Sequence, residues 1–178
     1  MRYLYDYKNP IKQSAQQAQT MLTFALFESM SRHLNCFRGL SHGRLTVATV
    51  PSSSGRAGVH PVHEMLRMFR DVPVVEIAYT GPARLERAER RILDPDRFEV
   101  DPLQAEGAHV LLIDDTWVSG AHMQSAAAAL HGAGAVWVSA VPIGRMLKKA
   151  GKDTAPFLRS VSERTFDPYV CPISGQPH

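Results

Sequence analysis

The sequence predicts an α/β protein with a mostly parallel sheet and helices on both faces. Short runs of aliphatic and β-branched residues alternate along the chain with amphipathic or charged segments of helical character. Such alternation is typical of parallel strands joined by crossover helices. One run of four apolar residues, Val110–Ile113, indicates a strand buried on both faces. A length of 178 residues is sufficient for a sizeable core, so we expect a single domain over residues 1–178.

The N-terminal half contains two expected strands and three expected helices. Apolar residues recur at helical spacing over Ala15–Leu34, which predicts an amphipathic helix. Arg44–Val50 is β-branched and runs into Pro51, which predicts a strand followed by a loop. The remaining elements are, in order, a helix over His60–Phe69, a strand over Val72–Ile77 and a charged helix over Leu85–Leu93.

The C-terminal half contains the buried strand. We expect a short strand over Arg97–Val100, a loop over Asp101–Gly107 and, after Val110–Ile113, a helix over Met123–Leu130. A further strand over Ala135–Val141 leads through the loop Pro142–Gly144 into a short helix over Arg145–Ala150. Residues 151–178 are expected to form an irregular tail, because prolines interrupt them at four positions: Pro156, Pro168, Pro172 and Pro177.

Composition is that of an ordinary globular protein, with 44% hydrophobic and 21% charged residues. No apolar run reaches the roughly 18 residues of a membrane span, and Met1–Asp6 lacks the apolar core of a signal peptide. Two cysteines, Cys36 and Cys171, give no disulfide framework. We therefore expect a cytoplasmic protein without a membrane partner.

The net charge is only +3, but basic residues gather in two clusters. Such clusters suit a polyphosphate, a nucleic acid or simply a solvated helix face. Aromatic residues are not interleaved with them, which argues against nucleic acid. The clusters are Arg84, Arg87, Arg90 and Arg91, and then Arg145, Lys148 and Lys149.

Two adjacent carboxylates, Asp114 and Asp115, follow the buried strand, and a turn ending in Ser-Gly leads into the next helix. The N–H groups of such a turn and the helix dipole attract a phosphate. The carboxylates can accept hydrogen bonds from ribose hydroxyls or help hold Mg²⁺. The pattern predicts a site for a phosphorylated sugar. Its residues are Asp114, Asp115, Val118, Ser119, Gly120, Ala121 and His122.

A second loop of small residues follows the expected strand Arg44–Val50. Successive N–H groups in such a loop form a concave anion site, and one arginine adds a forked cation. In a parallel sheet both loops lie beyond the C-terminal strand ends, where ligands bind. The candidate residues for binding pyrophosphate are Ser52, Ser53, Ser54, Gly55 and Arg56.

The run Val110–His122 resembles the phosphoribosyl pyrophosphate (PRPP) signature of type I phosphoribosyltransferases. That signature has four hydrophobic residues, two acids, two hydrophobic residues, two hydroxyl residues, Gly, any residue and a hydroxyl residue. The strand, both acids, Ser119 and Gly120 match it, whereas Thr116, Val118 and His122 depart from it.

A narrower resemblance, to ComF-type and amidophosphoribosyltransferase-like proteins, covers roughly Tyr5–Arg145. It is carried by the opening Tyr5-Asp6-Tyr7-Lys8, by the Val-Pro-Ser loop with its Arg and His-Pro, and by Leu-Ile-Asp-Asp-Thr-Trp-Val-Ser-Gly. The paired N-terminal cysteine motifs of the ComF zinc finger are missing from this chain.

The resemblance implies the type I phosphoribosyltransferase fold and transfer of a phosphoribosyl group from PRPP to a nucleobase- or amine-type acceptor, with release of pyrophosphate. It implies Asp114, Asp115 and Arg56 as catalytic residues. It also implies Mg²⁺ at the two acids, directly or through ligand or water, and Arg84 and Arg87 as flap residues that close over pyrophosphate.

Two further expectations follow from the resemblance. The family builds its acceptor pocket from variable terminal additions, so the tail 151–178 is the expected hood on the acceptor side, with Phe166, Tyr169 and Cys171. A homodimer is compatible with the family. The alternative function is a non-catalytic module that binds PRPP or a nucleotide, or a ComF-like protein associated with DNA uptake. Val118 and His122 favour this alternative, because they replace hydroxyl residues.

Three side-chain assignments stay open in the sequence. His122 could pair with phosphate as imidazolium or merely begin a helix, and Trp117 could line the site or pack in the core. Zinc could in principle use a set of two histidines and two cysteines, but their spacing is not that of a known zinc ribbon, so we expect structural thiols instead. That set is His33, Cys36, Cys171 and His178.

Overall fold

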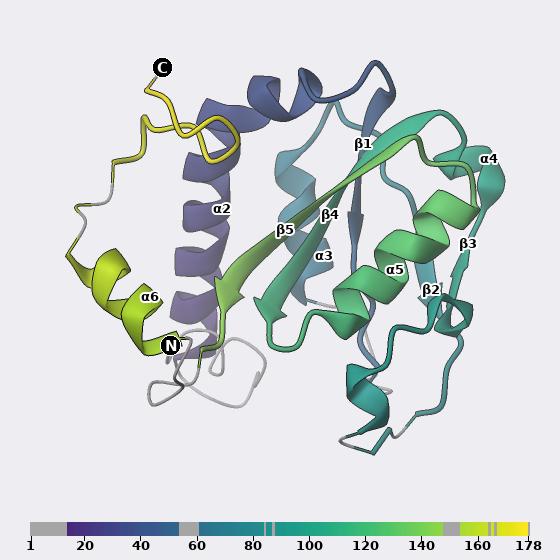
Figure 1. Ribbon diagram of the computed structural model, residues 1–178. Coiled ribbons are helices and arrows are strands. Elements are labelled where there is room, and N and C mark those ends of the chain that lie inside the picture. Colours follow the sequence, from purple (N-terminus) through teal and green to yellow (C-terminus); the bar gives the residue numbers. More distant parts are fainter. Residues whose placement is uncertain are drawn as a thin grey trace.

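The computed structural model is an α/β protein built on a parallel sheet (Figure 1). It describes residues 14–53, 61–83, 85–86, 88–147, 154–163, 165 and 167–177. Three strands, β1 (Arg44–Thr49), β4 (Ala108–Trp117) and β5 (Trp137–Arg145), lie in the order β1-β4-β5, and both neighbouring pairs are parallel. The expected fold class is therefore confirmed.

Strand β4 is central because its side chains are apolar on both faces. Residues 108–113 are buried, and successive residues enter opposite cores. Leu111 and Ile113 pack into one hydrophobic cluster, while Val110 and Leu112 pack into the other. Each such buried side chain contributes roughly 1.5–3 kcal/mol.

Helices cover both faces of the sheet. On one face α2 (Ala15–Arg38), α3 (Pro61–Met65) and the 3-10 turn η1 (Leu66–Met68) pack on Leu111 and Ile113. On the other face α5 (Ala121–Gly132) packs on Val110 and Leu112.

The helix expected over His60–Phe69 is confirmed in outline. It ends as the 3-10 turn η1, and Phe69 lies beyond it.

A two-stranded antiparallel ribbon lies beside α5. It is made of β2 (Ile77–Tyr79) and β3 (Phe98–Val100). The strand expected over Val72–Ile77 is wrong in extent, because Val74 forms an isolated bridge, to Val47 of β1, and Ile77 already belongs to β2. The backbone of Val75 still hydrogen-bonds that of Val47, so the segment runs beside the sheet before β2 begins.

Two expected loops contain regular structure instead. Pro102–Ala105 forms the short helix α4, and Asp101 caps it by accepting a hydrogen bond from the Leu103 N–H at 2.9 Å. Pro142–Gly144 belongs to β5, which continues to Arg145. Proline is tolerated there because β5 lies at the edge of the three-stranded sheet.

The helix expected over Leu85–Leu93 is not formed as such. Its described residues contain only the 3-10 turn η2 (Glu89–Arg91), which a second turn, η3 (Pro95–Arg97), follows. The expected helix over Arg145–Ala150 is not seen in its described part, since Arg145 ends β5; residues 148–150 lie outside the described part of the chain.

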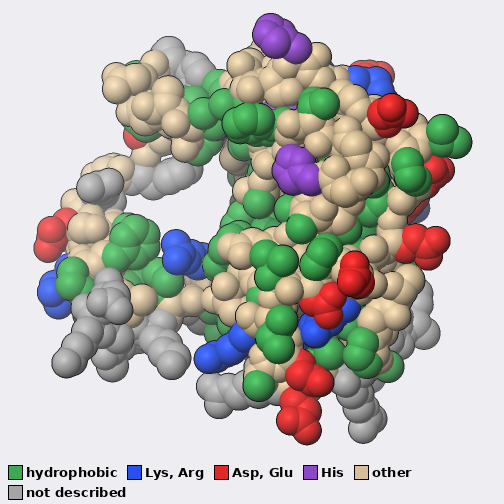
Figure 2. Space-filling view, turned by 45° about the vertical axis from the view of Figure 1, so that its right-hand side comes forward, with side chains coloured by type: hydrophobic (Ala, Val, Ile, Leu, Met, Phe, Trp, Pro, Cys, Tyr) green, Lys and Arg blue, Asp and Glu red, His purple; other side chains and the backbone are tan. Residues whose placement is uncertain are grey.

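The tail is not irregular throughout, which corrects the expectation for 151–178. Helix α6 (Thr154–Ser162) forms there because Pro156 lies in the first turn, where a missing N–H costs little. None of the described residues of α6 is buried, and Figure 2 shows this segment standing off from the body of the protein. The described helices include none that is both long and apolar enough to cross a membrane.

Candidate functional site

A cavity of about 490 Å³ opens at the C-terminal edge of the parallel sheet. The loop after β1 and the turn after β4 both line it, together with the segment between β2 and β4 that includes η2, η3 and β3. The structure thus brings together the two loops that the sequence singles out, although more than 60 residues separate them. From the predicted phosphate-binding sets, the lining contains Ser52, Ser53, Asp114, Asp115, Val118, Ser119, Gly120 and His122.

The two carboxylates lie on the last part of β4 and differ in burial. Asp115 is only 3% exposed, whereas Asp114 is partly exposed. The Asp115 N–H donates to Oδ1 of Asp114 at 2.8 Å, which fixes the Asp114 side chain beside the strand backbone. Both residues line the cavity.

Gly120 makes the turn between β4 and α5 possible. Its φ of 85° lies in the left-handed region, and a Cβ atom at this position would lie 2.3 Å from the Trp117 ring. The N–H of Ala121 approaches Oγ of Ser119 at 3.4 Å. The turn therefore places the N-terminus of the 12-residue helix α5 at the cavity, where its dipole and N–H groups favour an anion.

Trp117 combines both roles that the sequence leaves open. Its ring packs against the core on the α5 side of the sheet and also lines the cavity.

His122 joins the two loops. Its Nε2 donates to the carbonyl oxygen of Pro51 at 2.9 Å, and its ring packs against Tyr79 and Phe98, with centroids 5.7 and 5.0 Å away. Burial lowers the pKa of His122 below its ordinary 6.5; the hydrogen bond to Pro51 acts in the opposite direction, and the nearby Arg97 charge lowers the pKa further. A neutral ring bonded to a carbonyl is a brace for the loops, so the imidazolium contact to phosphate that the sequence allows is not favoured by this geometry.

The loop after β1 is held by the sheet where it begins. The N–H of Val50 donates to the carbonyl of Ile113 at 3.0 Å, so the loop leaves β1 directly beside the acids of β4. Pro51, Ser52 and Ser53 line the cavity. The other predicted members of this loop, Ser54, Gly55 and Arg56, lie outside the described residues.

Three arginines line the cavity: Arg90, Arg91 and Arg97. The first two belong to the basic cluster noted in the sequence, whose other members, the flap candidates Arg84 and Arg87, lie outside the described residues.

Arg97 is a residue that the sequence reasoning missed. Its Nε bonds Asp94 at 2.8 Å and its guanidinium donates to the Glu89 carbonyl at 3.1 Å, so it is fixed before any ligand arrives. The sequence signal that could have indicated Arg97 is its spacing from Asp94. The two residues are three positions apart in a turn that contains a proline.

The donor set at the end of β4 suits a magnesium ion. Aspartate oxygens are hard ligands of the kind that Mg²⁺ prefers, and it usually binds one or two carboxylates together with substrate phosphates. Asp114 and Asp115 carry such oxygens, and both residues line the cavity.

The tail does not line this cavity in the part of the chain that is described. Its residues 167–177 approach α2 instead, where the Tyr169 ring lies 4.8 Å from the Arg32 guanidinium and Cys171 is buried. Phe166, a further candidate for the acceptor side, lies outside the described residues.

Comparison with solved structures finds distant similarity to phosphoribosyltransferases. A hypoxanthine-guanine phosphoribosyltransferase of L. donovani is 13% identical, with 73% of this chain and 83% of that chain covered and a TM-score of 0.47. A hypoxanthine phosphoribosyltransferase of Trypanosoma cruzi is 12% identical, with 72% and 78% covered and a TM-score of 0.44.

A purine phosphoribosyltransferase of Pyrococcus horikoshii is also 12% identical, with 68% and 80% covered and a TM-score of 0.37. At such identities and scores the activities of those enzymes do not carry over to this chain. No protein-family model and no curated protein matches it.

Proposed function

We propose that this protein binds PRPP in the cavity and transfers its phosphoribosyl group to a nucleobase- or amine-type acceptor, as a type I phosphoribosyltransferase. The observation that carries the proposal is the meeting of two loops at one cavity. One loop supplies two carboxylates followed by a helix N-terminus, and the other supplies small hydroxyl residues. PRPP has the matching parts, which are a 5′-phosphate, ribose hydroxyls and a pyrophosphate.

Each part of PRPP has a complementary group in this arrangement. The turn 118–122 and the start of α5 would bind the 5′-phosphate through backbone N–H groups. Asp114 and Asp115 would accept hydrogen bonds from the ribose hydroxyls. Ser52 and Ser53, with Arg90 or Arg91, would bind the pyrophosphate, which carries the most negative charge.

Catalysis would then consist of positioning and electrostatic stabilisation. Substitution at the anomeric carbon inverts its configuration, builds positive charge on the ribose and releases pyrophosphate. The carboxylates stabilise the positive charge, and the arginines stabilise the leaving group. Mg²⁺, held with PRPP at Asp114 and Asp115, would neutralise charge on the pyrophosphate.

One observation favours a second candidate function, which is binding without turnover. His122 stands at the position where the resembling signature ends in a hydroxyl residue, and its ring nitrogen is engaged with the Pro51 carbonyl. The cavity therefore lacks that hydroxyl group as a contact for phosphate. A protein that binds PRPP or a nucleotide as a signal needs the phosphate and ribose contacts but no acceptor.

The test is to incubate the full chain with PRPP, Mg²⁺ and a panel of nucleobases and amines while pyrophosphate is measured. Release of pyrophosphate that depends on an acceptor supports the transferase. Saturable PRPP binding without release supports the binding protein. Salt-sensitive DNA binding without affinity for PRPP contradicts both.

A further inference from the structure

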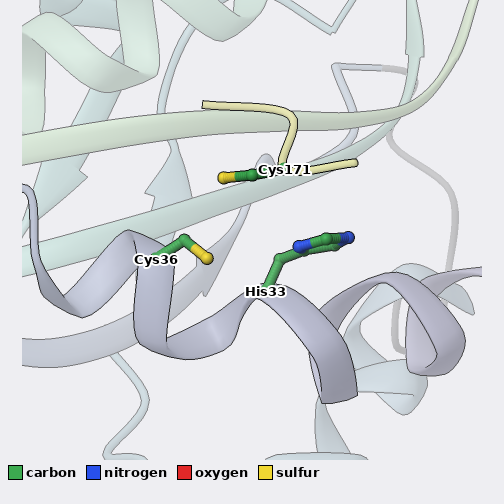
Figure 3. Close-up of side chains that lie close together, drawn as sticks. All are labelled: His33, Cys36 and Cys171. Carbon is green, nitrogen blue, oxygen red and sulfur yellow. The ribbon is translucent and has the colours of Figure 1, made fainter. Parts of the chain in front are cut away.

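A second cluster of chemically active side chains lies on α2, apart from the cavity. His33 and Cys36 come from α2 and Cys171 comes from the tail, and their ligand atoms all lie within 4.8 Å of one another (Figure 3). None of the three lines the cavity described above. The cluster joins two segments that are 135 residues apart in the chain, so it is also a point where the tail is fixed to the body.

The three side chains are sheltered from solvent. His33 and Cys36 are three residues apart and therefore share one face of the helix. His33 and Cys171 are each 4% exposed, and Cys36 is partly buried. The structure has no disulfide between the two cysteines.

His33 is oriented as metal-binding histidines usually are. Its Nε2 lies 3.0 Å from the carbonyl oxygen of Pro168, and a carbonyl can only accept, so Nε2 carries the proton. In the neutral ring the lone pair then lies on Nδ1. A backbone carbonyl that fixes the second ring nitrogen in this way is the common outer contact of a metal-bound imidazole.

Cys171 lies in a turn that favours its thiolate. The N–H of Ser174 approaches its Sγ at 3.5 Å, and the N–H of Gly175 donates to the Cys171 carbonyl at 2.8 Å. Gly175 has a φ of 69°, which lets the backbone curl around the sulfur. A thiolate, rather than a thiol, is what binds a metal ion.

We propose that His33, Cys36 and Cys171 bind a zinc ion that fastens the C-terminal tail to α2. One nitrogen and two sulfur ligands are the soft donor set that zinc prefers. Tetrahedral zinc needs these atoms about 3.5–3.8 Å apart, so side-chain shifts of about 1 Å from the 4.8 Å limit would complete the site. A water molecule suffices for the fourth position. His178, the remaining member of the set considered in the sequence, lies outside the described residues.

A disulfide between the two cysteines is the competing chemistry. It would need an oxidant and would not involve His33, although this side chain is buried, oriented and placed beside both sulfurs. A zinc ion would bind the side chains of His33, Cys36 and Cys171 together. The experiment must therefore separate zinc binding from oxidation of the thiols.

The experiment uses the full chain, purified under reducing conditions, stripped with a chelator and titrated with Zn²⁺ against a chromophoric competitor. About one Zn²⁺ per chain is expected. His33→Ala, Cys36→Ser and Cys171→Ser should each weaken zinc binding by roughly 100-fold or more. His42→Ala, a histidine outside the cluster, is the control and should leave the affinity unchanged. Co²⁺ in place of zinc should give a thiolate-to-cobalt absorption band that Cys171→Ser abolishes.

Two further measurements keep the proposal testable if a variant folds poorly. Ser174→Cys adds a thiolate at the C-x2-C spacing of zinc turns and should tighten binding by roughly tenfold or more. Removing zinc from the wild type should lower its Tm by about 5–15 °C, and the Tm of Cys171→Ser should not respond. The proposal is overturned if the reduced wild type binds no zinc, if the three variants bind it as tightly as the wild type, or if the thiols form a disulfide whether or not zinc is present.

Discussion

The two aspartates at the end of β4 occupy different environments although they are adjacent. Asp115 is buried and Asp114 is partly exposed, although both line the same cavity at the end of the strand. Strand β4 is continuous through both residues, so their separation is set by the strand rather than by a loop. This rigidity suits carboxylates that must meet two hydroxyls of one sugar.

We predict that Asp114→Asn and Asp115→Asn each weaken PRPP binding by about 10- to 100-fold. A hydrogen bond to a charged group contributes about 1.5–3 kcal/mol, and the amide keeps the shape of the carboxylate. Calorimetric titration with PRPP and Mg²⁺ measures the effect. Asp71→Asn, an exposed residue outside the cavity lining, is the matched control. Unchanged affinity in both variants would remove these residues from the site.

His122 should act as a neutral brace rather than as a cation that contacts phosphate. Its pKa is lowered by burial, so it is uncharged at neutral pH. We expect the ratio of PRPP affinities of the wild type and His122→Gln to stay constant from about pH 8 to about pH 6.5. Using the ratio cancels the titration of PRPP itself. A ratio that rises as the pH falls would show that an imidazolium binds the ligand.

At the scale of elements, β4, its turn and α5 form the unit that creates the phosphate site. The turn depends on Gly120, whose backbone conformation and contact with Trp117 exclude a side chain. We predict that Gly120→Ala lowers the free energy of unfolding by about 1–3 kcal/mol and also weakens PRPP binding. Urea unfolding and calorimetry measure the two effects. Gly132→Ala, near the end of the same helix and with open space around it, should change neither by more than a few tenths of a kcal/mol.

The elements that could be predicted from the sequence are those with a strong periodic pattern. The expected helix over Ala15–Leu34 is confirmed as α2, and the expected strand at Val110–Ile113 is the core of β4. Sequence patterns predict secondary structure poorly where contacts with other segments of the fold determine it. Pro142 stops a strand in the sequence, but β4 pairs with β5 through this position, at Asp114. Pro95 comes just after the helix expected over Leu85–Leu93, and the turn that it begins supplies Arg97 to the cavity.

Part of the candidate site could also be predicted, since the motif at Asp114–Gly120 is local in sequence. The contacts that shape the site are not local. The bond between His122 and Pro51 joins residues 71 apart, and the anchoring of Arg97 depends on η2 and η3. The proposed zinc ligands illustrate the same limit, because their spacing in the sequence matches no known zinc ribbon and only the folded chain brings Cys171 to His33 and Cys36.

For the molecule as a whole, stability should depend on pH through buried histidines. His109 is fully buried between β4 and β5, where its Nε2 bonds Oγ of Ser139 at 3.0 Å, and burial lowers its pKa below 6.5. Below about pH 6.5 the unfolded chain therefore binds a proton that the folded chain resists. The pKa of His122 is also lowered, so this residue likewise makes the folded protein less stable as the pH falls.

We predict that the free energy of unfolding falls as the pH drops from about 6.5 through the lowered pKa of His109. Above about pH 7.5 the contribution of His109 to the free energy of unfolding should be nearly constant. Urea unfolding at several pH values measures the slope. His109→Gln should reduce the slope on the acid side, while His42→Gln should leave it close to that of the wild type. An equal slope in the wild type and His109→Gln would show that this residue does not contribute.

We expect backbone N–H groups at the start of α5 to hold the 5′-phosphate of PRPP while Asp114 and Asp115 hold its ribose. A crystal structure of the full chain with PRPP and Mg²⁺ tests this most directly. We predict that the 5′-phosphate lies in the turn 118–122, the ribose hydroxyls lie within hydrogen-bond distance of the two carboxylates, and the pyrophosphate lies beside Ser52 and Ser53. A ligand bound elsewhere on the protein, or a cavity that stays without ligand at saturating PRPP, would contradict it.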